Sequence, residues 1–181
     1  HSPRQAFFNL DDRCIYSCVF CNISNQGFLK NYNNEKFIKL ILNASKHKDI
    51  SSVALTSGIY PNNTKIIKKM CYIIKNVRKK LPNIPIGVEP YISNKHELFL
   101  LKKAGANEIK INVQIPDKKL FCKLCPNFSY EDTFKILEES VKIFGIGKVS
   151  SNIIYGVGKS DRSILNAVER LAKISVVPTL R

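Results

Sequence analysis

Apolar residues along the chain follow two alternating patterns. Short runs rich in β-branched and aromatic residues predict six strands, at residues 7–10, 50–55, 84–88, 108–115, 149–155 and 175–180. Between them, apolar residues spaced three and four apart predict five amphipathic helices, at residues 35–46, 63–80, 94–103, 130–144 and 161–174. Residues 116–128 show neither pattern and are predicted to form a loop.

Capping residues support several of the predicted helix ends. Asn34 is the expected N-cap of the first helix, because an Asn side chain accepts a hydrogen bond from a backbone N–H of the first turn. Ser129 and Asp132 resemble a capping box at the start of the fourth helix. Gly105 and Gly145 are placed to end the third and fourth helices.

Strict alternation of strands and helices implies an α/β fold with parallel pairing and right-handed crossovers. Six strands in this length fit either a doubly wound sheet or an open partial barrel, and periodicity does not separate the two. A complete eight-fold barrel typically needs about 250 residues and is disfavoured. We predict one domain over residues 1–181 that stops at its last strand, and the start at His1 suggests an excised segment.

The composition is that of a globular protein from a reducing compartment. Hydrophobic residues make up 44% of the 181 residues and charged residues 24%. No apolar run is long enough to span a membrane, and the N-terminus has no signal-peptide layout. Six cysteines without an export signal indicate reduced thiols. We therefore predict a cytoplasmic protein with no membrane partner.

The net charge of +15 leaves two interpretations open. A strongly basic chain can bind RNA. The densest basic run, residues 65–80, however alternates with apolar residues in the pattern of an amphipathic helix whose basic face is solvated. The solvated face is the preferred interpretation, and an RNA partner is the alternative.

Three cysteines near the N-terminus carry the clearest chemical signal. Cys14, Cys18 and Cys21 have the spacing C-x3-C-x2-C, and Phe20 precedes the last of them. Three thiolates within eight residues can bind one metal centre, and three protein ligands leave a coordination position open for chemistry. A disulfide-rich loop and a zinc knuckle are the alternatives.

This spacing and the aromatic residue resemble the radical S-adenosylmethionine (radical SAM) superfamily. The resemblance implies a six-stranded parallel partial (β/α)6 barrel of the TIM type. It implies that Cys14, Cys18 and Cys21 hold a 4Fe-4S cluster whose fourth iron binds the amino and carboxylate groups of S-adenosyl-L-methionine, with Phe20 beside the adenine. It also implies an external one-electron reductant of the ferredoxin or flavodoxin type.

The resemblance extends to residues that follow the next three predicted strands. Thr56, Ser57 and Gly58 stand where the family usually has Gly-Gly-Glu, which receives the amino group of the methionine moiety, although no acidic residue follows in this chain. Glu89 ends the third strand, where it serves either the amino group or the substrate, or is merely solvated. In the fourth strand, Gln114 and, more weakly, Asn112 match the polar residues that bind the ribose hydroxyls or the carboxylate; alternation places both on one face, opposite residues 111, 113 and 115.

Residues 152–160 resemble the fifth-strand motif of the family, which packs along the adenine. Asn152, Ile154 and Gly156 are therefore predicted cofactor-binding residues, whereas Lys159 replaces the usual acidic residue. The segment from 125 to 155 looks most like the biotin-synthase-like branch of the superfamily.

A second C-x2-C spacing, Cys122 and Cys125, lies in the predicted loop. It could begin an auxiliary cluster site, but the one cysteine left to add is Cys71, which lies on the apolar side of a predicted helix and is expected in the core.

The resulting functional prediction is a radical SAM enzyme. Reductive cleavage of S-adenosylmethionine would give a 5′-deoxyadenosyl radical that abstracts hydrogen from a small-molecule substrate, in a reaction of cofactor biosynthesis. The alternatives are a radical SAM enzyme that modifies RNA and a non-catalytic iron–sulfur or zinc module.

Overall fold

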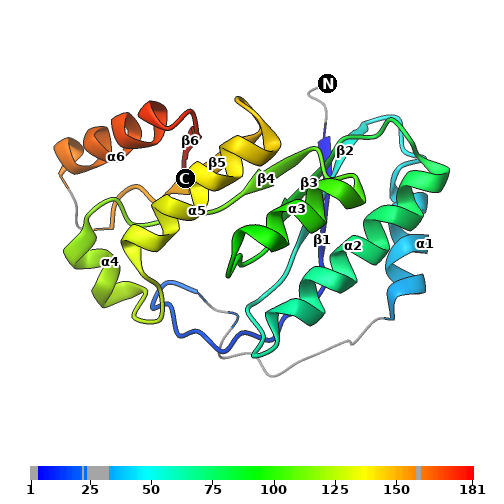
Figure 1. Cartoon of the computed structure of the whole chain (residues 1–181), viewed down its shortest axis with the longest axis horizontal. Coiled ribbons are helices and arrows are strands. Elements are labelled where there is room, and N and C mark those ends of the chain that lie inside the picture. Colours follow the sequence, from blue (N-terminus) through cyan, green and yellow to red (C-terminus); the bar gives the residue numbers. More distant parts are fainter. Residues whose placement is uncertain (1–3, 22, 24–32, 158–159) are drawn as a thin grey trace.

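Six parallel strands form one sheet, in the order in which they occur along the chain. The computed structural model describes residues 4–21, 23, 33–157 and 160–181. Its strands are β1 (Arg4–Asn9), β2 (Ile50–Thr56), β3 (Ile86–Glu89), β4 (Glu108–Lys110), β5 (Val149–Ile153) and β6 (Val177–Leu180). Its helices are α1 (Asn34–Ala44), α2 (Asn63–Lys80), α3 (Lys95–Ala104), α4 (Lys118–Leu124), α5 (Tyr130–Phe144) and α6 (Asp161–Lys173), arranged as Figure 1 shows.

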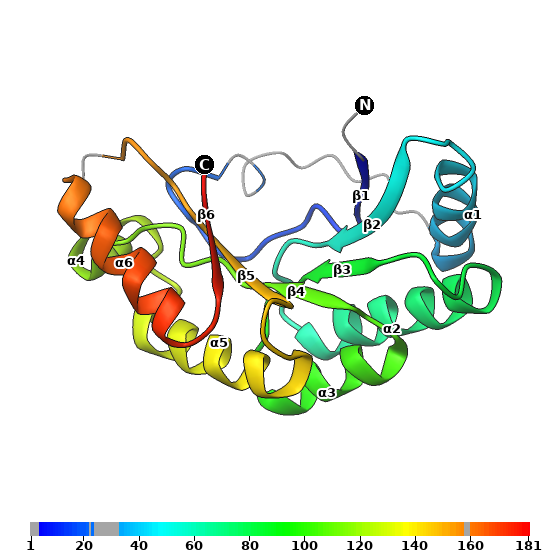
Figure 2. The same cartoon turned by 90° about the horizontal axis from the view of Figure 1, so that it is seen from above.

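The strand order decides between the two architectures that the sequence leaves open. A doubly wound sheet reverses its strand order at a switch point. In this sheet the order never reverses, and β1 and β6 are the two edges of the described sheet. Seen from above, the sheet curves and the helices cover its convex side (Figure 2). The predicted open (β/α)6 partial barrel is therefore confirmed.

The register of the strands brings their C-terminal ends to one level. Asn9 pairs with Thr56, and Thr56 pairs with Glu89, so the last residues of β1, β2 and β3 lie side by side. Functional residues of parallel β/α folds gather at these ends, because the connecting loops converge there. The loop of the three cysteines and the loop after β2 consequently start from adjacent positions.

Apolar faces of the helices pack on the convex side of the sheet. In α2, Ile67, Met70 and Ile74 are completely buried, and they belong to the same hydrophobic core as the strand residues Val53 and Leu55. No helix in the described part of the chain is long and apolar enough to cross a membrane.

Two of the cations in the basic run of α2 bind backbone carbonyl groups. Lys69 Nζ donates to the carbonyl oxygen of Leu10 at 2.8 Å. Arg78 Nη2 donates to the carbonyl oxygen of Gly105, also at 2.8 Å, and stabilises the start of β4. These two side chains are half-buried, so the solvated basic face consists of the exposed lysines 65, 68, 75, 79 and 80.

Several predicted helix ends are confirmed, and one is wrong by a residue. Gly105 ends α3 with a left-handed φ of 110°. Ser129 Oγ accepts a hydrogen bond from the N–H of Asp132, as a capping residue of α5 should. The N-cap of α1 is Asn33 rather than the predicted Asn34, since the Asn33 side chain accepts from the N–H of Lys36 at 2.9 Å.

The segment after the third helix departs most from the prediction. The fourth strand ends at Lys110 instead of residue 115, and Gln114 makes only an isolated bridge to Ile153. Gln114 has a φ of 62°, and the N–H of Ile115 donates to the carbonyl of Val113 around it, so this turn breaks the predicted alternation. Residues 118–124 of the predicted loop form α4, whose N-cap is Asp117.

Candidate functional site

A cavity of about 550 Å³ opens at the C-terminal ends of the strands. Its walls come from the loops after β1, β2, β3 and β4, from α4 and from the first half of α5. Most of the predicted site residues line it, namely Cys14, Cys18, Phe20, Cys21, Thr56, Ser57, Gly58, Glu89, Asn112 and Gln114. Side chains from four separate connections thus face one space.

Between residues 14 and 20, the cysteine loop presents alternate residues to this cavity. Cys14, Tyr16, Cys18 and Phe20 line it, whereas residues 15, 17 and 19 do not, and Cys21 lines it directly after Phe20. The three motif thiols are free and half-buried. In the part of the chain that the structure describes, no three His, Cys, Asp or Glu side chains lie close enough together to hold a metal ion. The loop therefore brings three thiols to one cavity, but their sulfur atoms do not lie close enough together to bind a single metal ion.

The loop after β2 supports the cysteine loop from one side. The N–H of Gly58 donates to the carbonyl of Asp11 at 2.7 Å, and the N–H of Ile15 donates to the carbonyl of Ile59 at 2.8 Å. A Cβ atom on Gly58 would lie 2.2 Å from the carbonyl oxygen of Arg13. The small residue predicted to approach a ligand is therefore also required by the close approach of the cysteine loop.

A charged pair fixes the start of the cysteine loop. Arg13 donates to both carboxylate oxygens of Asp11, at 2.9 and 2.6 Å, and its guanidinium lies 4.3 Å from the ring centroid of Tyr60. The hydrogen bond from Arg13 holds the pKa of the buried Asp11 below its ordinary value of 3.8. No local pattern in the sequence signals this pair, because it depends on the turn that the loop makes.

Asp11→Asn is expected to destabilise the apo-protein in a pH-dependent way. Because the folded pKa of Asp11 is lowered, its ionised form contributes stability that is complete above the unfolded pKa and is lost as the pH falls through the folded pKa. We expect a cost of about 1–2 kcal/mol in the free energy of unfolding at pH 7, shrinking below pH 3.8. Urea unfolding of both proteins between pH 3 and pH 7 measures it, and a difference that stays constant with pH would contradict this role.

A fourth thiol lies beside the motif. Cys125 is buried at the end of α4, and its side chain hydrogen-bonds that of Cys18. This contact lowers the pKa of Cys18 to about 7, and the same contact raises the pKa of Cys125. Cys122 is exposed, and Cys71 is half-buried against the core from α2. The predicted C-x2-C pair is thus divided between the surface and the wall of the cavity.

Polar groups on the strand ends form a connected wall. Asn112 Nδ2 donates to the carboxylate of Glu89, and Asn112 Oδ1 accepts from the backbone N–H of Asn152 at 3.1 Å. Ser57 Oγ is buried and has no hydrogen-bond partner among the residues that the structure describes. A buried hydroxyl without a partner is costly unless a ligand or water completes it. Ser57 therefore marks a position where a polar ligand group fits.

Gln114 reaches the cavity through the irregular turn after β4. Its N–H donates to the carbonyl of Asn152 at 2.8 Å, and its own carbonyl accepts from Ile154 at 2.7 Å. These two bonds hold a left-handed conformation that costs energy for a residue other than glycine, and such positions concentrate at functional sites. Ile111 also lines the cavity beside Asn112, whereas alternation predicted it on the opposite face.

Three predicted residues of the fifth strand do not line the cavity. Asn152 contributes its backbone to the polar wall, while its side-chain oxygen is buried without a hydrogen-bond partner in the described ranges. Ile154 is partly buried against the core, and Gly156 has a φ of 82° with no described atom close to its Cβ position. Lys159 lies outside the residues that the structure describes.

Aromatic residues that the sequence pattern did not single out form part of the wall. The ring of Tyr16 meets the rings of Phe128 and Tyr91 edge-on, with centroids 4.8 and 5.7 Å apart. Tyr16 lies inside the motif and could have been identified by its position. Phe128 could not, because nothing in its neighbourhood indicates a contact with a loop more than one hundred residues earlier.

The chemistry of the three motif thiols fits the 4Fe-4S cluster that the cysteine motif implies. Three free thiols on one cavity wall are donors of the kind that a 4Fe-4S cluster with one open iron would need. The unpartnered hydroxyl of Ser57, the carboxylate of Glu89 and the ring of Phe20 offer polar and apolar contacts for a nucleotide in the same space. Chemically, the cavity suits both a cluster and an organic cosubstrate.

Comparison with known proteins agrees with this chemistry. The family model described as the radical SAM superfamily matches residues 8–171. Among curated protein sequences none matches at a significant level. Solved structures with the same fold include a methylornithine synthase (PylB), with a TM-score of 0.82 at 19% identity over 97% of this chain and 52% of that one.

Two further structures extend the comparison. The FeFe-hydrogenase maturase HydG from Carboxydothermus hydrogenoformans has a TM-score of 0.78 at 14% identity, over 96% of this chain and 44% of that one. SuiB from Streptococcus suis, solved bound to S-adenosylmethionine, has a TM-score of 0.73 at 15% identity, over 99% and 39%. The chain spans 39% to 52% of the length of these three proteins.

Proposed function

Because the chain belongs to the radical SAM superfamily, we propose that it holds a 4Fe-4S cluster on Cys14, Cys18 and Cys21 and binds S-adenosyl-L-methionine in the cavity beside them. When bound, the cluster and S-adenosylmethionine together supply a 5′-deoxyadenosyl radical that removes a hydrogen atom from a substrate. The observation that carries the proposal is that the three free thiols share a cavity with the polar strand ends.

The residues of the second loop would bind the methionine end of the cosubstrate. The unpartnered Ser57 Oγ is an acceptor for its amino group, and Gly58 lines the same part of the cavity. Thr56 Oγ1 donates to the carbonyl of Glu89 at 3.1 Å and so fixes the ends of β2 and β3 against each other. A rigid pair of strand ends holds the ligand in one orientation.

The polar wall would bind the ribose and the carboxylate. Asn112 is held from both sides, by Glu89 and by the backbone of Asn152, so its amide presents a fixed edge. Gln114 faces the cavity from its strained turn, and Phe20 provides a ring for the adenine. Ile154 and Gly156 remain candidates for the adenine edge on the resemblance of their motif alone.

We further propose a small-molecule substrate and a place in the biotin-synthase-like branch. A cavity of about 550 Å³ lies within the range of small-molecule sites, roughly 300–1,000 Å³, and apolar and aromatic residues form part of its wall beside the polar strand ends. The apolar part of the wall suits the containment of a radical. An external one-electron reductant of the ferredoxin or flavodoxin type is the expected partner.

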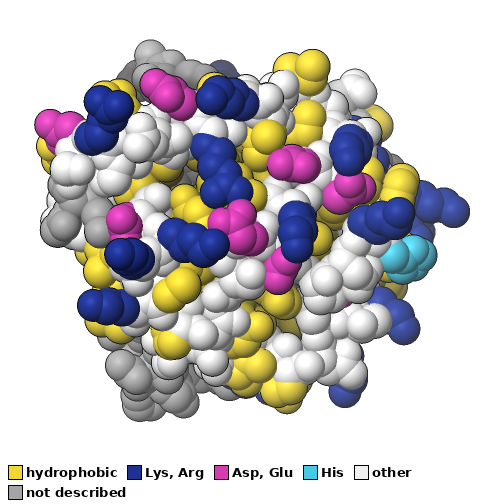
Figure 3. All heavy atoms as spheres, turned by 60° about the vertical axis from the view of Figure 1, so that its left-hand side comes forward, with side chains coloured by type: hydrophobic (Ala, Val, Ile, Leu, Met, Phe, Trp, Pro, Cys, Tyr) yellow, Lys and Arg dark blue, Asp and Glu magenta, His cyan; other side chains and the backbone are white. Residues whose placement is uncertain are grey.

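An enzyme that modifies RNA is the second candidate, favoured by the net charge of +15. Its footprint would have to include the exposed lysines of α2. On the face around α4 and α6, by contrast, Lys and Arg side chains are interspersed with Asp and Glu (Figure 3). Binding of a mixed RNA pool that weakens steeply with added salt would favour this candidate, and no binding at low salt would exclude it.

Anaerobic reconstitution tests the proposal. The protein is loaded with iron and sulfide, freed of excess metal and mixed with dithionite and S-adenosylmethionine. We expect about four irons per chain and the formation of 5′-deoxyadenosine. A protein that takes up zinc but no iron–sulfur cluster, and forms no 5′-deoxyadenosine, would instead be a structural metal module.

A further inference from the structure

The docking segment, Leu124–Phe128, joins α4 to α5 and lies against the cysteine loop. The N–H of Val19 donates to the carbonyl of Leu124 at 2.9 Å. Both the N–H and the hydroxyl of Ser17 donate to Asn127 Oδ1, at 3.1 and 3.2 Å. Together with the ring contact to Tyr16, these bonds connect parts of the chain that are 110 residues apart.

The bonds fall on alternate residues of the cysteine loop. The N–H groups of residues 15, 17 and 19 are bound by the loop after β2, by Asn127 and by Leu124 respectively. Residues 14, 16, 18 and 20, which flank these three, line the cavity. The three backbone bonds thus fix the loop on both sides of Tyr16 and Cys18, and so fix the positions from which Cys14 and Cys18 face the cavity.

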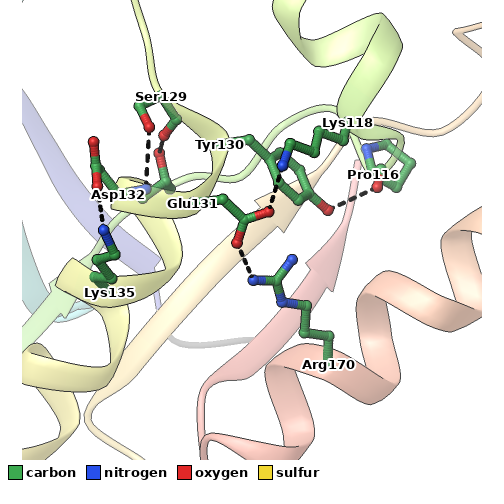
Figure 4. A network of polar contacts seen from close by, with 9 residues as sticks. Pro116, Lys118, Ser129, Tyr130, Glu131, Asp132, Lys135 and Arg170 are labelled. Carbon is green, nitrogen blue, oxygen red and sulfur yellow. Dashed lines mark hydrogen bonds and ion pairs between the residues drawn. The ribbon is translucent and has the colours of Figure 1, made fainter.

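The docking segment is itself held firmly. Glu131 accepts from Lys118 Nζ at 3.0 Å and from Arg170 Nη2 at 2.7 Å, which ties α4, α5 and α6 together (Figure 4). The hydroxyl of Tyr130 donates to the carbonyl of Pro116 at 2.9 Å, as Figure 4 also shows. These contacts join the start of α4 to the start of α5, and so restrict the position of the docking segment between the two helices.

We infer that Asn127 is a positioning residue for the cluster, which it serves by holding Ser17 so that the thiols on either side of it face the cavity. The inference rests on the proposed cluster site. Of the three backbone N–H bonds that hold the cysteine loop, the bond at Ser17 is accepted by a side chain, so a substitution can remove it without altering the backbone.

Three variants test the inference. Asn127→Ala removes the acceptor for both Ser17 bonds, and Asn127→Asp keeps an oxygen in the same place while it adds a charge. Asn76→Ala is the matched control, because the Asn76 side chain bonds within α2, to the carbonyl of Tyr72. Urea unfolding of the apo-proteins shows whether each variant folds.

Hydrogen exchange in the apo-protein measures the docking itself. In Asn127→Ala, the amide of Ser17 should exchange about tenfold faster than in the wild type, since a lost hydrogen bond exposes it to solvent. Asn76→Ala should leave this amide unchanged. Equal exchange in Asn127→Ala and the wild type would overturn the inference, whether or not the protein binds iron.

Iron release from the reconstituted protein measures the consequence for the cluster. Asn127→Ala should release iron to a ferrous chelator about fivefold to tenfold faster than the wild type, and Asn127→Asp should stay within about twofold of it. The added charge of Asn127→Asp should also lower the midpoint potential of the cluster. Release of iron from Asn127→Ala at the wild-type rate would overturn the inference. If the wild type bound no iron, the proposed function would be overturned instead, and hydrogen exchange alone would show whether Asn127 holds Ser17.

Discussion

Alanine in place of Cys14, Cys18 or Cys21, one at a time, is expected to reduce bound iron from about four per chain to nearly none. Each thiol is free and faces the same cavity, and the described part of the structure holds no cluster of His, Cys, Asp or Glu elsewhere that could take over the role. Formation of 5′-deoxyadenosine should fall below detection in all three variants. Iron analysis and chromatography of the products measure both effects.

Cys122→Ala is the matched control for these variants. Cys122 is exposed on α4 and does not line the cavity, so its loss should leave iron content and product formation at the wild-type level. If Cys122→Ala lost as much iron as Cys14→Ala, the cluster would depend on the second C-x2-C pair, and the assignment of Cys14, Cys18 and Cys21 as its ligands would be wrong.

Gly58→Ala is expected to disrupt the site from the neighbouring loop. The new Cβ would lie 2.2 Å from the carbonyl oxygen of Arg13 and 3.2 Å from Cβ of Cys14, so the backbone of the cysteine loop must move. Overpacking of this kind typically costs about 1–3 kcal/mol in the free energy of unfolding. Because the loop that moves carries the thiols, we expect iron loading to fall by at least about tenfold.

Gly87→Ala provides the comparison for this substitution. A Cβ at Gly87, in β3, would meet its nearest atoms at 3.8 and 3.9 Å, which is ordinary van der Waals contact. Its unfolding free energy and iron content should therefore stay near those of the wild type. Equal behaviour of the two alanine variants in urea unfolding and iron analysis would show that the cysteine loop does not depend on the close approach of Gly58.

The elements that could be predicted from the sequence are those whose signals are local. The bounds of α2 and α5 are those expected, because each has a long amphipathic pattern and a capping residue at its start. The fourth strand was overpredicted, since the turn at Gln114 is imposed by bonds to β5 that no local pattern reveals. The helix α4 was missed because it has seven residues and one buried side chain, Phe121, so it shows no helical periodicity of apolar residues.

The same division holds for the candidate site. The cavity lies at the C-terminal ends of the strands, where functional residues of parallel β/α folds gather. This position could be predicted, because the loop of Cys14, Cys18 and Cys21 follows the first predicted strand. The partners of the cysteine loop could not be predicted, because Asn127 and Phe128 follow an element that the sequence did not reveal. Strand ends can be located from periodicity, but the contacts between their loops depend on the tertiary fold.

The central claim is that three thiols leave one iron of a cluster open to S-adenosylmethionine. The most direct measurement is the electron paramagnetic resonance spectrum of the reduced, reconstituted protein before and after S-adenosylmethionine is added. The claim predicts a reduced 4Fe-4S signal whose g-values change on addition, because the cosubstrate becomes a ligand of the open iron. A 4Fe-4S signal that is identical with and without S-adenosylmethionine, or no such signal at all, would contradict it.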